Sequence, residues 1–373
     1  MKKFVSVLLT LILISGIITV CGASEIKTLR IGYQPSTHQI AEMTAMEKGW
    51  WTRDLAKFGV ENITDTEFSS GPPEMTAMMA GELDVAYVGT APPITAIDKG
   101  LDAKIVASVN TNGSALVLSP GLAANYTSPA DLKGLKIATF PQGSIQDTIL
   151  KKWLKDNGLD PGRDVHIIGA GPGEAITEIM AGVVDGVFLP APSPTIIEMA
   201  DAGKTVVYSG EMFPNHACCC LLVSGRLIRE HPELVKQIIR THINATRYNN
   251  EHKEEAAEIY ARKVRGTDVE KVKESIKRWD GAWVYDPHIE VNSTLVYAKV
   301  DYEMDYTNKL LTEEDLFDTS LYDEVMGIAP APGTVSPTPQ PTPQPTSQPT
   351  PGFTSLLVIA ALLVYIVLRR FKI

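Results

Sequence analysis

An internal repeat constrains the fold of this chain more than any other feature. The segments that begin Gly71-Pro72-Pro73-Glu74 and Gly171-Pro172-Gly173-Glu174 each predict a helix that ends at an Ala-Gly pair. In both copies an aspartate and an apolar strand follow, and the loop after that strand is rich in alanine and proline. A duplicated helix–strand unit predicts two similar α/β lobes.

Short apolar segments alternate with amphipathic ones over most of the chain. This alternation predicts parallel sheets in an α/β fold, and two such lobes form a cleft where the carboxyl ends of their strands face each other. The expected strands are Leu29–Tyr33, Asn62–Phe68, Val85–Val88, Lys104–Ser108, Ala115–Leu118, Leu135–Phe140, Val165–Gly169 and Gly186–Phe188. From Pro232 onward the chain is expected to be mostly helical.

Both ends of the chain indicate export. Residues 1–23 combine a basic start, an apolar run and the small pair Gly22-Ala23, which is typical of a secretory signal peptide. Residues 330–351 form a Pro/Thr/Gln-rich stalk, and residues 352–373 add an apolar segment with terminal cations. We therefore expect a protein on the extracellular face of the cell membrane, anchored by its C-terminus.

The C-terminal segment has two interpretations. As a transmembrane helix, Phe353–Leu368 is short, and the positive-inside rule places Arg369 and Arg370 in the cytoplasm. Alternatively, the Pro-Gly-Phe motif followed by an apolar helix and a basic tail resembles the PGF-type sorting signal of archaeal surface proteins.

Asn-x-Ser/Thr sequons, which fit an exterior glycoprotein, occur at Asn62, Asn112, Asn125, Asn244 and Asn292.

Charge and motifs exclude several classes of function. A net charge of −10 argues against nucleic acid as a partner. The sequence has no Walker loop, no Gly-x-Ser-x-Gly and no His-Glu-x-x-His motif, so it predicts no enzyme and no cofactor. Cys218, Cys219 and Cys220 are adjacent and cannot form a loop-closing disulfide framework.

Four segments together resemble one family. Their order and spacing are similar to the solute-binding proteins of nitrate, aliphatic-sulfonate and taurine ABC importers. The segments are Leu29–Tyr33, Glu47–Trp51, Met79–Ala86 and Asp131–Ala138. The resemblance implies a type II periplasmic-binding-protein fold, in which a two-crossing hinge joins two α/β lobes (a Venus flytrap).

The resemblance also implies the lobe boundaries. Residues 24–112 and 224–329 would form lobe I, and residues 113–223 would form lobe II. The chain would cross between them at residues 110–113 and again at residues 221–224. Such a protein is expected to be a monomer that delivers a small anionic or zwitterionic solute to the permease and ATPase subunits of an importer.

Polar turns after the expected strands are the candidate ligand-binding residues. The clearest is Gln142-Gly143-Ser144, where Ser144 is predicted to cap a helix whose N-terminus suits a sulfonate, nitrate or carboxylate. The alternative is that Ser144 serves only as a helix cap, so the prediction depends on several turns converging on one cleft. The other candidates are Gln34, Ser36, Thr37, His38, Ser69, Ser70, Gly71, Thr90, Gly171, Asn215 and His216.

These turns contain no Lys or Arg, and their only basic residues are His38 and His216. A singly charged oxyanion held by neutral donors is therefore expected, rather than a phosphate ester. Glu174 could pair with the ammonium group of a taurine-like zwitterion. Since Glu74 occupies the matching repeat position, the simpler interpretation is a first-turn carboxylate that complements the helix dipole.

The three cysteines are expected in a buried strand near the hinge. The yeast-type thiamin-pyrimidine synthase shares this fold and a cysteine-rich run, so binding or synthesis of a thiamin-pyrimidine precursor is one alternative. A surface interaction protein without a transport role is another. Cys218, Cys220 and His216 are a possible set of metal ligands, because alternate strand residues share a face. A fourth ligand is not evident, so the sequence predicts no metal site.

Overall fold

The computed structural model describes residues 25–329. The expected signal segment, stalk and C-terminal anchor lie outside the described residues. Among residues 25–329, no helix is both long and apolar enough to cross a membrane.

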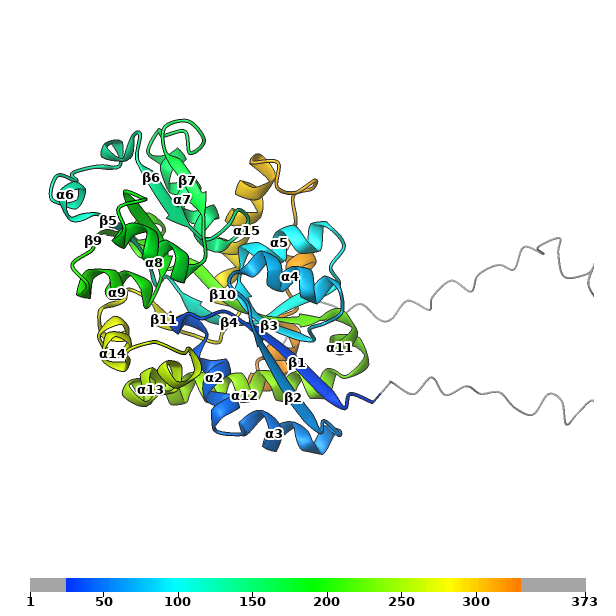
Figure 1. The fold of residues 1–373 in the computed structure, drawn as a ribbon. Helices are drawn as coiled ribbons and strands as arrows, with labels where there is room; N and C mark the ends of the chain where they lie inside the picture. The colour runs from blue at the N-terminus through cyan, green and yellow to red at the C-terminus, as the bar shows by residue number, and fades with distance from the viewer. Residues whose placement is uncertain (1–24, 330–373) are drawn as a thin grey trace, which may run out of the picture. The chain divides into compact units, whose positions relative to one another are not determined.

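The described strands form two separate sheets (Figure 1). The first sheet has the order β11-β4-β10-β3-β1-β2, and the second has the order β7-β6-β8-β5-β9. The strands are β1 (Thr28–Tyr33), β2 (Asn62–Glu67), β3 (Val85–Gly89), β4 (Ala103–Thr111), β5 (Ser114–Leu118), β6 (Lys136–Thr139), β7 (His166–Gly169), β8 (Gly186–Pro190), β9 (Lys204–Tyr208), β10 (Ala217–Ser224) and β11 (Ala282–Trp283).

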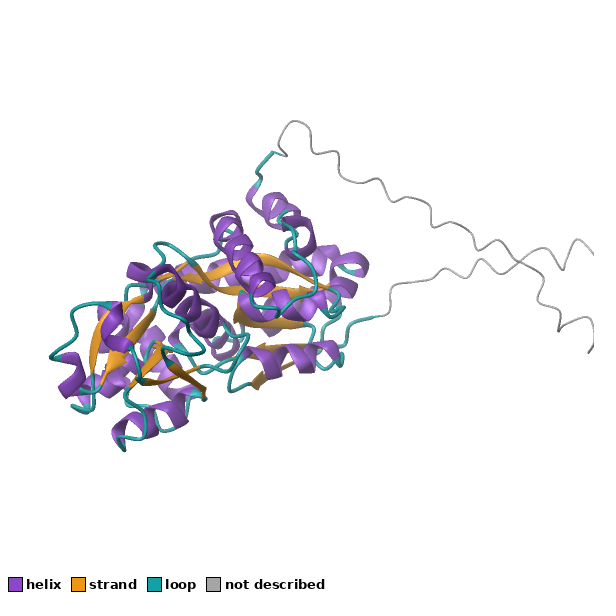
Figure 2. Ribbon diagram, turned by 90° about the horizontal axis from the view of Figure 1, so that it is seen from above, coloured by secondary structure: helices purple, strands orange, loops and turns teal. Residues whose placement is uncertain are grey.

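Helices flank both groups of strands (Figure 2). The longer ones are α2 (Ile40–Glu47), α3 (Trp50–Leu55), α4 (Gly71–Met79), α5 (Ala91–Asp98), α7 (Ile145–Asp156), α8 (Pro172–Met180), α9 (Ser193–Met199), α11 (Gly225–Glu230), α12 (Pro232–Glu251), α13 (Lys253–Lys263), α14 (Val269–Arg278), α15 (His288–Glu303) and α17 (Ser320–Met326). Short turns of helix are η1 (Thr37–Gln39), η2 (Ala56–Phe58), α6 (Pro120–Ala123), η3 (Pro129–Leu132), α10 (Ser209–Met212) and α16 (Glu313–Leu316).

The two sheets have the same topology, which confirms the expected α/β fold with two lobes. Strands β2-β1-β3-β10-β4 correspond in order to β7-β6-β8-β5-β9. In each sheet the strand next to one edge pairs in parallel with both of its neighbours, β1 with β2 and β3, and β6 with β7 and β8. The next neighbour, β10 or β5, runs antiparallel. The repeat predicted from the sequence therefore corresponds to a repeated sheet.

One predicted boundary is wrong. Lobe II was expected to extend to residue 223, with a crossing at residues 221–224, but β10 pairs along its length with β3 and β4 of the first sheet. The chain therefore returns from the second sheet between α10 and Ala217. The reason is burial, because Cys218–Val223 is fully apolar and fills a central position of the first sheet.

The expected buried cysteine strand is confirmed, since all three cysteines lie in β10 and are buried.

The first crossing follows β4, where Asn112 and Gly113 have φ values of 50° and 94°. Asn112 is one of the five sequons, and it is buried with its amide donating to the carbonyl of Asp280. The other four sequon asparagines are exposed.

Candidate functional site

The predicted binding turns lie where the strands of the two sheets end, and we call this region the seam. On the side of the first sheet, Ser69 is exposed and the other candidates are buried: Gln34, Ser36, Thr37, His38, Ser70, Gly71 and Thr90. On the side of the second sheet and the crossings, Gly143, Ser144 and His216 are buried, Gly171 is half-buried, and Gln142 and Asn215 are exposed.

The two sides of the seam are in direct contact. The backbone N–H of Thr37 donates to the carbonyl of Ala191 over 3.0 Å. A Cβ placed on Gly171 would lie 3.8 Å from the Cβ of Ser69. Gly89 of β3 is also close to Ile145, since a Cβ there would lie 2.9 Å from the Ile145 side chain. The structure therefore corresponds to a closed arrangement of the lobes.

Three of the buried polar atoms without hydrogen-bond partners belong to residues that follow strands of the first sheet. Within residues 25–329, Thr37 Oγ1, Thr90 Oγ1 and Glu74 Oε1 are inaccessible and make no hydrogen bond. Leaving such a group unpaired costs about 1–3 kcal/mol, so each is rare in a folded protein. All three follow the carboxyl ends of strands in one sheet, which is where α/β folds bind ligands.

Glu74 is a site residue that the sequence prediction left out. It is fully buried, its Oε2 accepts a hydrogen bond of 2.7 Å from Gln34 Nε2, and burial raises its pKa well above the usual value. Burial therefore favours the protonated form of Glu74, and Oε1, which has no partner, is the position available for the proton. Gly32 makes room for this oxygen, because a Cβ there would lie 2.7 Å from Oε1.

The N–H groups of Gly143 and Asp147 at the Ser144 turn donate within the turn. The predicted cap is confirmed, since Ser144 Oγ accepts from the N–H of Asp147 over 3.2 Å. The N–H of Gly143 donates to the Asp147 carboxylate over 3.2 Å, and Lys151 pairs with the same carboxylate at 2.6 Å. The chain's own carboxylate thus takes the place at this helix terminus that was expected for an external anion.

His216 is neutral at physiological pH. Burial lowers its pKa to about 4. Its Nδ1–H donates to the carbonyl of Ala217 over 2.8 Å, which leaves Nε2 as an acceptor without a partner in the described residues. His216 therefore cannot supply a charge or a donor to an anion, although it can accept from a hydroxyl or ammonium group.

His38 contacts two of the three cysteines. Its Nδ1 lies 3.3 Å from Cys218 Sγ and 3.9 Å from Cys219 Sγ. Burial raises the pKa of the Cys218 thiol. The combination considered from the sequence, with Cys220 and His216, is not the one that the fold brings together.

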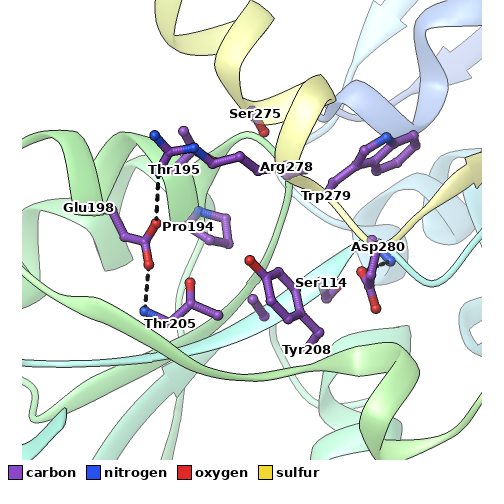
Figure 3. A pocket seen from close by; sticks show the side chains of 13 residues that line it. Ser114, Pro194, Thr195, Glu198, Thr205, Tyr208, Ser275, Arg278, Trp279 and Asp280 are labelled. Carbon is purple, nitrogen blue, oxygen red and sulfur yellow. Dashed lines mark hydrogen bonds and ion pairs between the residues drawn. The ribbon is translucent and has the colours of Figure 1, made fainter. Parts of the chain in front are cut away.

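A small pocket that the sequence did not predict lies beside the crossings, between α9, β9 and the end of α14 (Figure 3). The carboxylate of Asp280 accepts from the N–H groups of Gly113 and Gly210, over 2.9 and 2.7 Å, and so connects the first crossing with α10, which precedes the second. The cavity of about 20 Å³ has room for about one water molecule. In this closed form it is too small for a sulfonate.

The aromatic residues beside this pocket pack against the His38 turn. Trp283 Nε1 donates to the carbonyl of Thr37 over 2.8 Å, and the rings of Trp279 and His38 lie 5.5 Å apart. Arg278 faces Glu198 across the pocket at 3.6 Å, which joins α14 to α9 (Figure 3). The C-terminal helices therefore touch both lobes.

Comparison with known proteins agrees with this architecture. Residues 22–263 match the model of the NMT1-like family. The chain belongs to the NMT1-like family. Among its curated relatives, a putative aliphatic sulfonates-binding protein of Bacillus subtilis (strain 168) is 30% identical over 273 residues, which is 70% of this chain and 78% of that protein. A nitrate/nitrite binding protein of Nostoc sp. is 23% identical over 265 residues, covering 65% and 59%.

Solved structures share the fold. The alkanesulfonate-binding protein from Xanthomonas axonopodis pv. citri bound to MOPS has a TM-score of 0.68 at 21% identity, covering 79% of this chain and 99% of that one. The periplasmic nitrate-binding protein from Synechocystis PCC 6803 has a TM-score of 0.71 at 17% identity, covering 81% and 89%. At these identities the likeness concerns the fold alone.

Proposed function

We propose that this protein is the extracytoplasmic solute-binding receptor of an ABC importer, and that it captures a small oxyanion in the seam. An aliphatic sulfonate, taurine and nitrate are the first candidates. Bicarbonate joins them, because a relative from Synechococcus sp., 24% identical over 241 residues, is a bicarbonate-binding protein. The receptor would bind its solute without converting it, and would need no cofactor.

The observation that carries this proposal is the set of unpartnered neutral groups on the first-sheet side. The hydroxyls of Thr37 and Thr90 can each donate one hydrogen bond, and so can protonated Glu74. Neutral donors in a buried site stabilise a singly charged oxyanion without the cost of a buried cation. A doubly charged ligand would be poorly matched to them.

Binding would be coupled to closure of the lobes about the two crossings. We place lobe I in residues 25–112 and 217–329, and lobe II in residues 113–216, so that each carries a complete sheet. Asp280 holds the first crossing and α10 and would belong to the hinge. The permease and ATPase subunits of an importer would then receive the solute from the closed receptor.

Native mass spectrometry of the purified protein, followed by titration calorimetry with the four candidate solutes, tests this function. We expect one bound solute per chain and no change in total solute concentration after prolonged incubation. Steady chemical conversion would instead favour the thiamin-pyrimidine enzyme. Failure of every small solute to bind would favour a surface interaction protein.

We further propose that residues 352–373 keep the receptor at the cell surface, either as a membrane anchor or as a processed sorting signal. The proline-rich residues 330–351 would serve as a spacer that keeps the receptor near its importer and raises its effective concentration there. Deleting residues 352–373 should release ligand-competent protein into the medium. A truncated protein that stays cell-bound would contradict this.

A further inference from the structure

Three soft donor atoms meet at one buried point of the first sheet. His38, Cys218 and Cys219 each offer a ligand atom, and these atoms all lie within 4.8 Å of one another. The two distances from His38 Nδ1 to sulfur are 3.3 and 3.9 Å. Two ligands bound tetrahedrally to zinc, at its usual Zn–N and Zn–S bond lengths, lie roughly 3.6 Å apart. The spacing of the donors therefore suits one small cation.

The histidine is oriented for this role. Its Nε2 lies 2.9 Å from the carbonyl of Gly113, and a carbonyl can only accept, so Nε2 carries the proton. Nδ1 is left with a lone pair directed at the two sulfur atoms. A histidine that binds a metal usually donates its other N–H to such a backbone carbonyl, which fixes the tautomer and the ring orientation. The ring centroids of Trp279 and His38 lie 5.5 Å apart, and this contact further restricts the orientation of the imidazole.

An irregularity in β10 brings the two cysteines together. In a regular strand adjacent side chains point to opposite faces, so Cys218 and Cys219 would be separated. The pairing of β10 with β4 instead shifts register on both sides of Cys219. Such a bulge re-aims a side chain, and here both sulfurs reach the same imidazole while Cys220 does not. Apolar packing of the strand alone does not require a register shift that turns both sulfur atoms toward His38.

We propose that His38, Cys218 and Cys219 form a binding site for zinc. Zn²⁺ would displace the two thiol protons, and the resulting unit of one Zn²⁺, two thiolates and one neutral imidazole has no net charge. A neutral unit suits a fully buried position, whereas a monovalent soft cation would leave one negative charge there. Asn110 lies opposite Cys219 on β4 and keeps Oδ1 without a hydrogen bond, so it is the candidate for the fourth position.

The test is a titration of the full-length protein, purified under reducing conditions and without added solute. Zn²⁺ binding is measured by competition with a chromophoric chelator, and Co²⁺ serves as a spectroscopic substitute. We expect one tight Zn²⁺ per chain, the release of about two protons per ion, and a thiolate-to-cobalt charge-transfer band. Because no solute is present, failure of the transport function would not alter these results.

Cys220→Ala is the matched control, because Cys220 is buried in the same strand but lies outside the cluster. We expect Cys219→Ala and His38→Gln to weaken Zn²⁺ binding by about tenfold to a hundredfold or more, and Cys220→Ala to leave it within about twofold. Thermal melting of each apo-protein shows that the variants are folded. Absence of the charge-transfer band, or equal losses in Cys219→Ala and Cys220→Ala, would mean that the thiols only hydrogen bond to His38, and the proposal would be overturned.

Discussion

The two lobes share one strand order but differ at the turns that face each other. In the first lobe, the repeat glutamate Glu74 is fully buried and bonded to Gln34. In the second, its counterpart Glu174 is exposed. The same contrast separates Glu42, which is buried with both oxygens unpartnered, from Asp147, which pairs with Lys151. The two lobes therefore share a fold but differ in how their corresponding carboxyl groups are buried and paired.

This difference suggests a division of labour between the lobes. The unpartnered hydroxyls and the buried Glu74 of the first lobe can recognise a solute. At the Ser144 turn of the second lobe the carboxylate of Asp147 instead pairs with Lys151 and accepts from Gly143, so this turn would act as a cover. If this view is correct, matched substitutions in the two lobes will have unequal effects on ligand affinity and on the pH dependence of stability.

The largest expected effect concerns Glu42. Burial raises its pKa from 4.5 to about 8, so its contribution to stability is complete below pH 4.5 and is lost as the pH rises through 8. At about 1.36 kcal/mol per pKa unit, the loss is on the order of 3–5 kcal/mol. Glu42→Gln cannot ionise, and denaturant titrations between pH 4 and 9 should show a flatter profile. A profile parallel to that of the wild type would contradict the buried, uncharged Glu42.

Gly32→Ala tests the close packing behind Glu74. The new Cβ would lie 2.7 Å from both Glu74 Oε1 and Leu83 Cδ1, and the strain should reduce the free energy of unfolding by about 1–3 kcal/mol. Gly173→Ala in α8 is the control, because nothing lies within 4 Å of its Cβ position. Equal stability of the two variants would mean that the Glu74 and Leu83 side chains move away from the new Cβ at no cost in free energy.

Substitutions of Glu74 test whether its side chain acts as a neutral hydrogen-bond donor or as a charged acceptor. We expect Glu74→Ala to weaken solute binding about tenfold or more, because a buried donor is lost. Glu74→Gln keeps a neutral donor at this position and should stay within about threefold of the wild type. Glu174→Ala, on the exposed counterpart, should have no effect in titration calorimetry. If Glu74→Gln binds as weakly as Glu74→Ala, the site requires an ionised carboxylate and a cationic group on the solute.

The smallest effect is expected at the Ser144 cap. Ser144→Ala should cost about 1 kcal/mol of stability and weaken binding severalfold, because the cap lies in the seam. Ser224 caps α11 in the first lobe, and Ser224→Ala should cost similar stability without changing affinity. An unchanged dissociation constant for Ser144→Ala would remove this residue from the binding site.

The fold was largely predictable, because it depends on patterns that are local in sequence. Alternating strands and helices, the cap at Ser144 and the buried cysteine strand all follow from neighbouring residues. The boundary at residue 223 was wrong because strand pairing is long-range, and an apolar run such as Cys218–Val223 fits the centre of either sheet equally well. Sequence alone could not choose between them.

The site was less predictable for the same reason. His38 and Cys219 meet only because β10 contains a bulge, and bulges leave no clear signal in a single sequence. Glu74 was set aside because helix first turns often carry a carboxylate, and only the structure shows that this one is buried against Gly32. Burial of a polar group is a property of the assembled fold.

Titration calorimetry of the wild-type protein with nitrate, bicarbonate, taurine and a short aliphatic sulfonate tests the central claim most directly, when the solute concentration is followed afterwards. The account predicts that one of these solutes binds with one-to-one stoichiometry, that Glu74→Ala weakens this binding and Glu174→Ala does not, and that the solute is recovered unchanged. Binding that is equally sensitive to both substitutions, or conversion of the solute, would contradict a receptor whose first lobe recognises a small oxyanion.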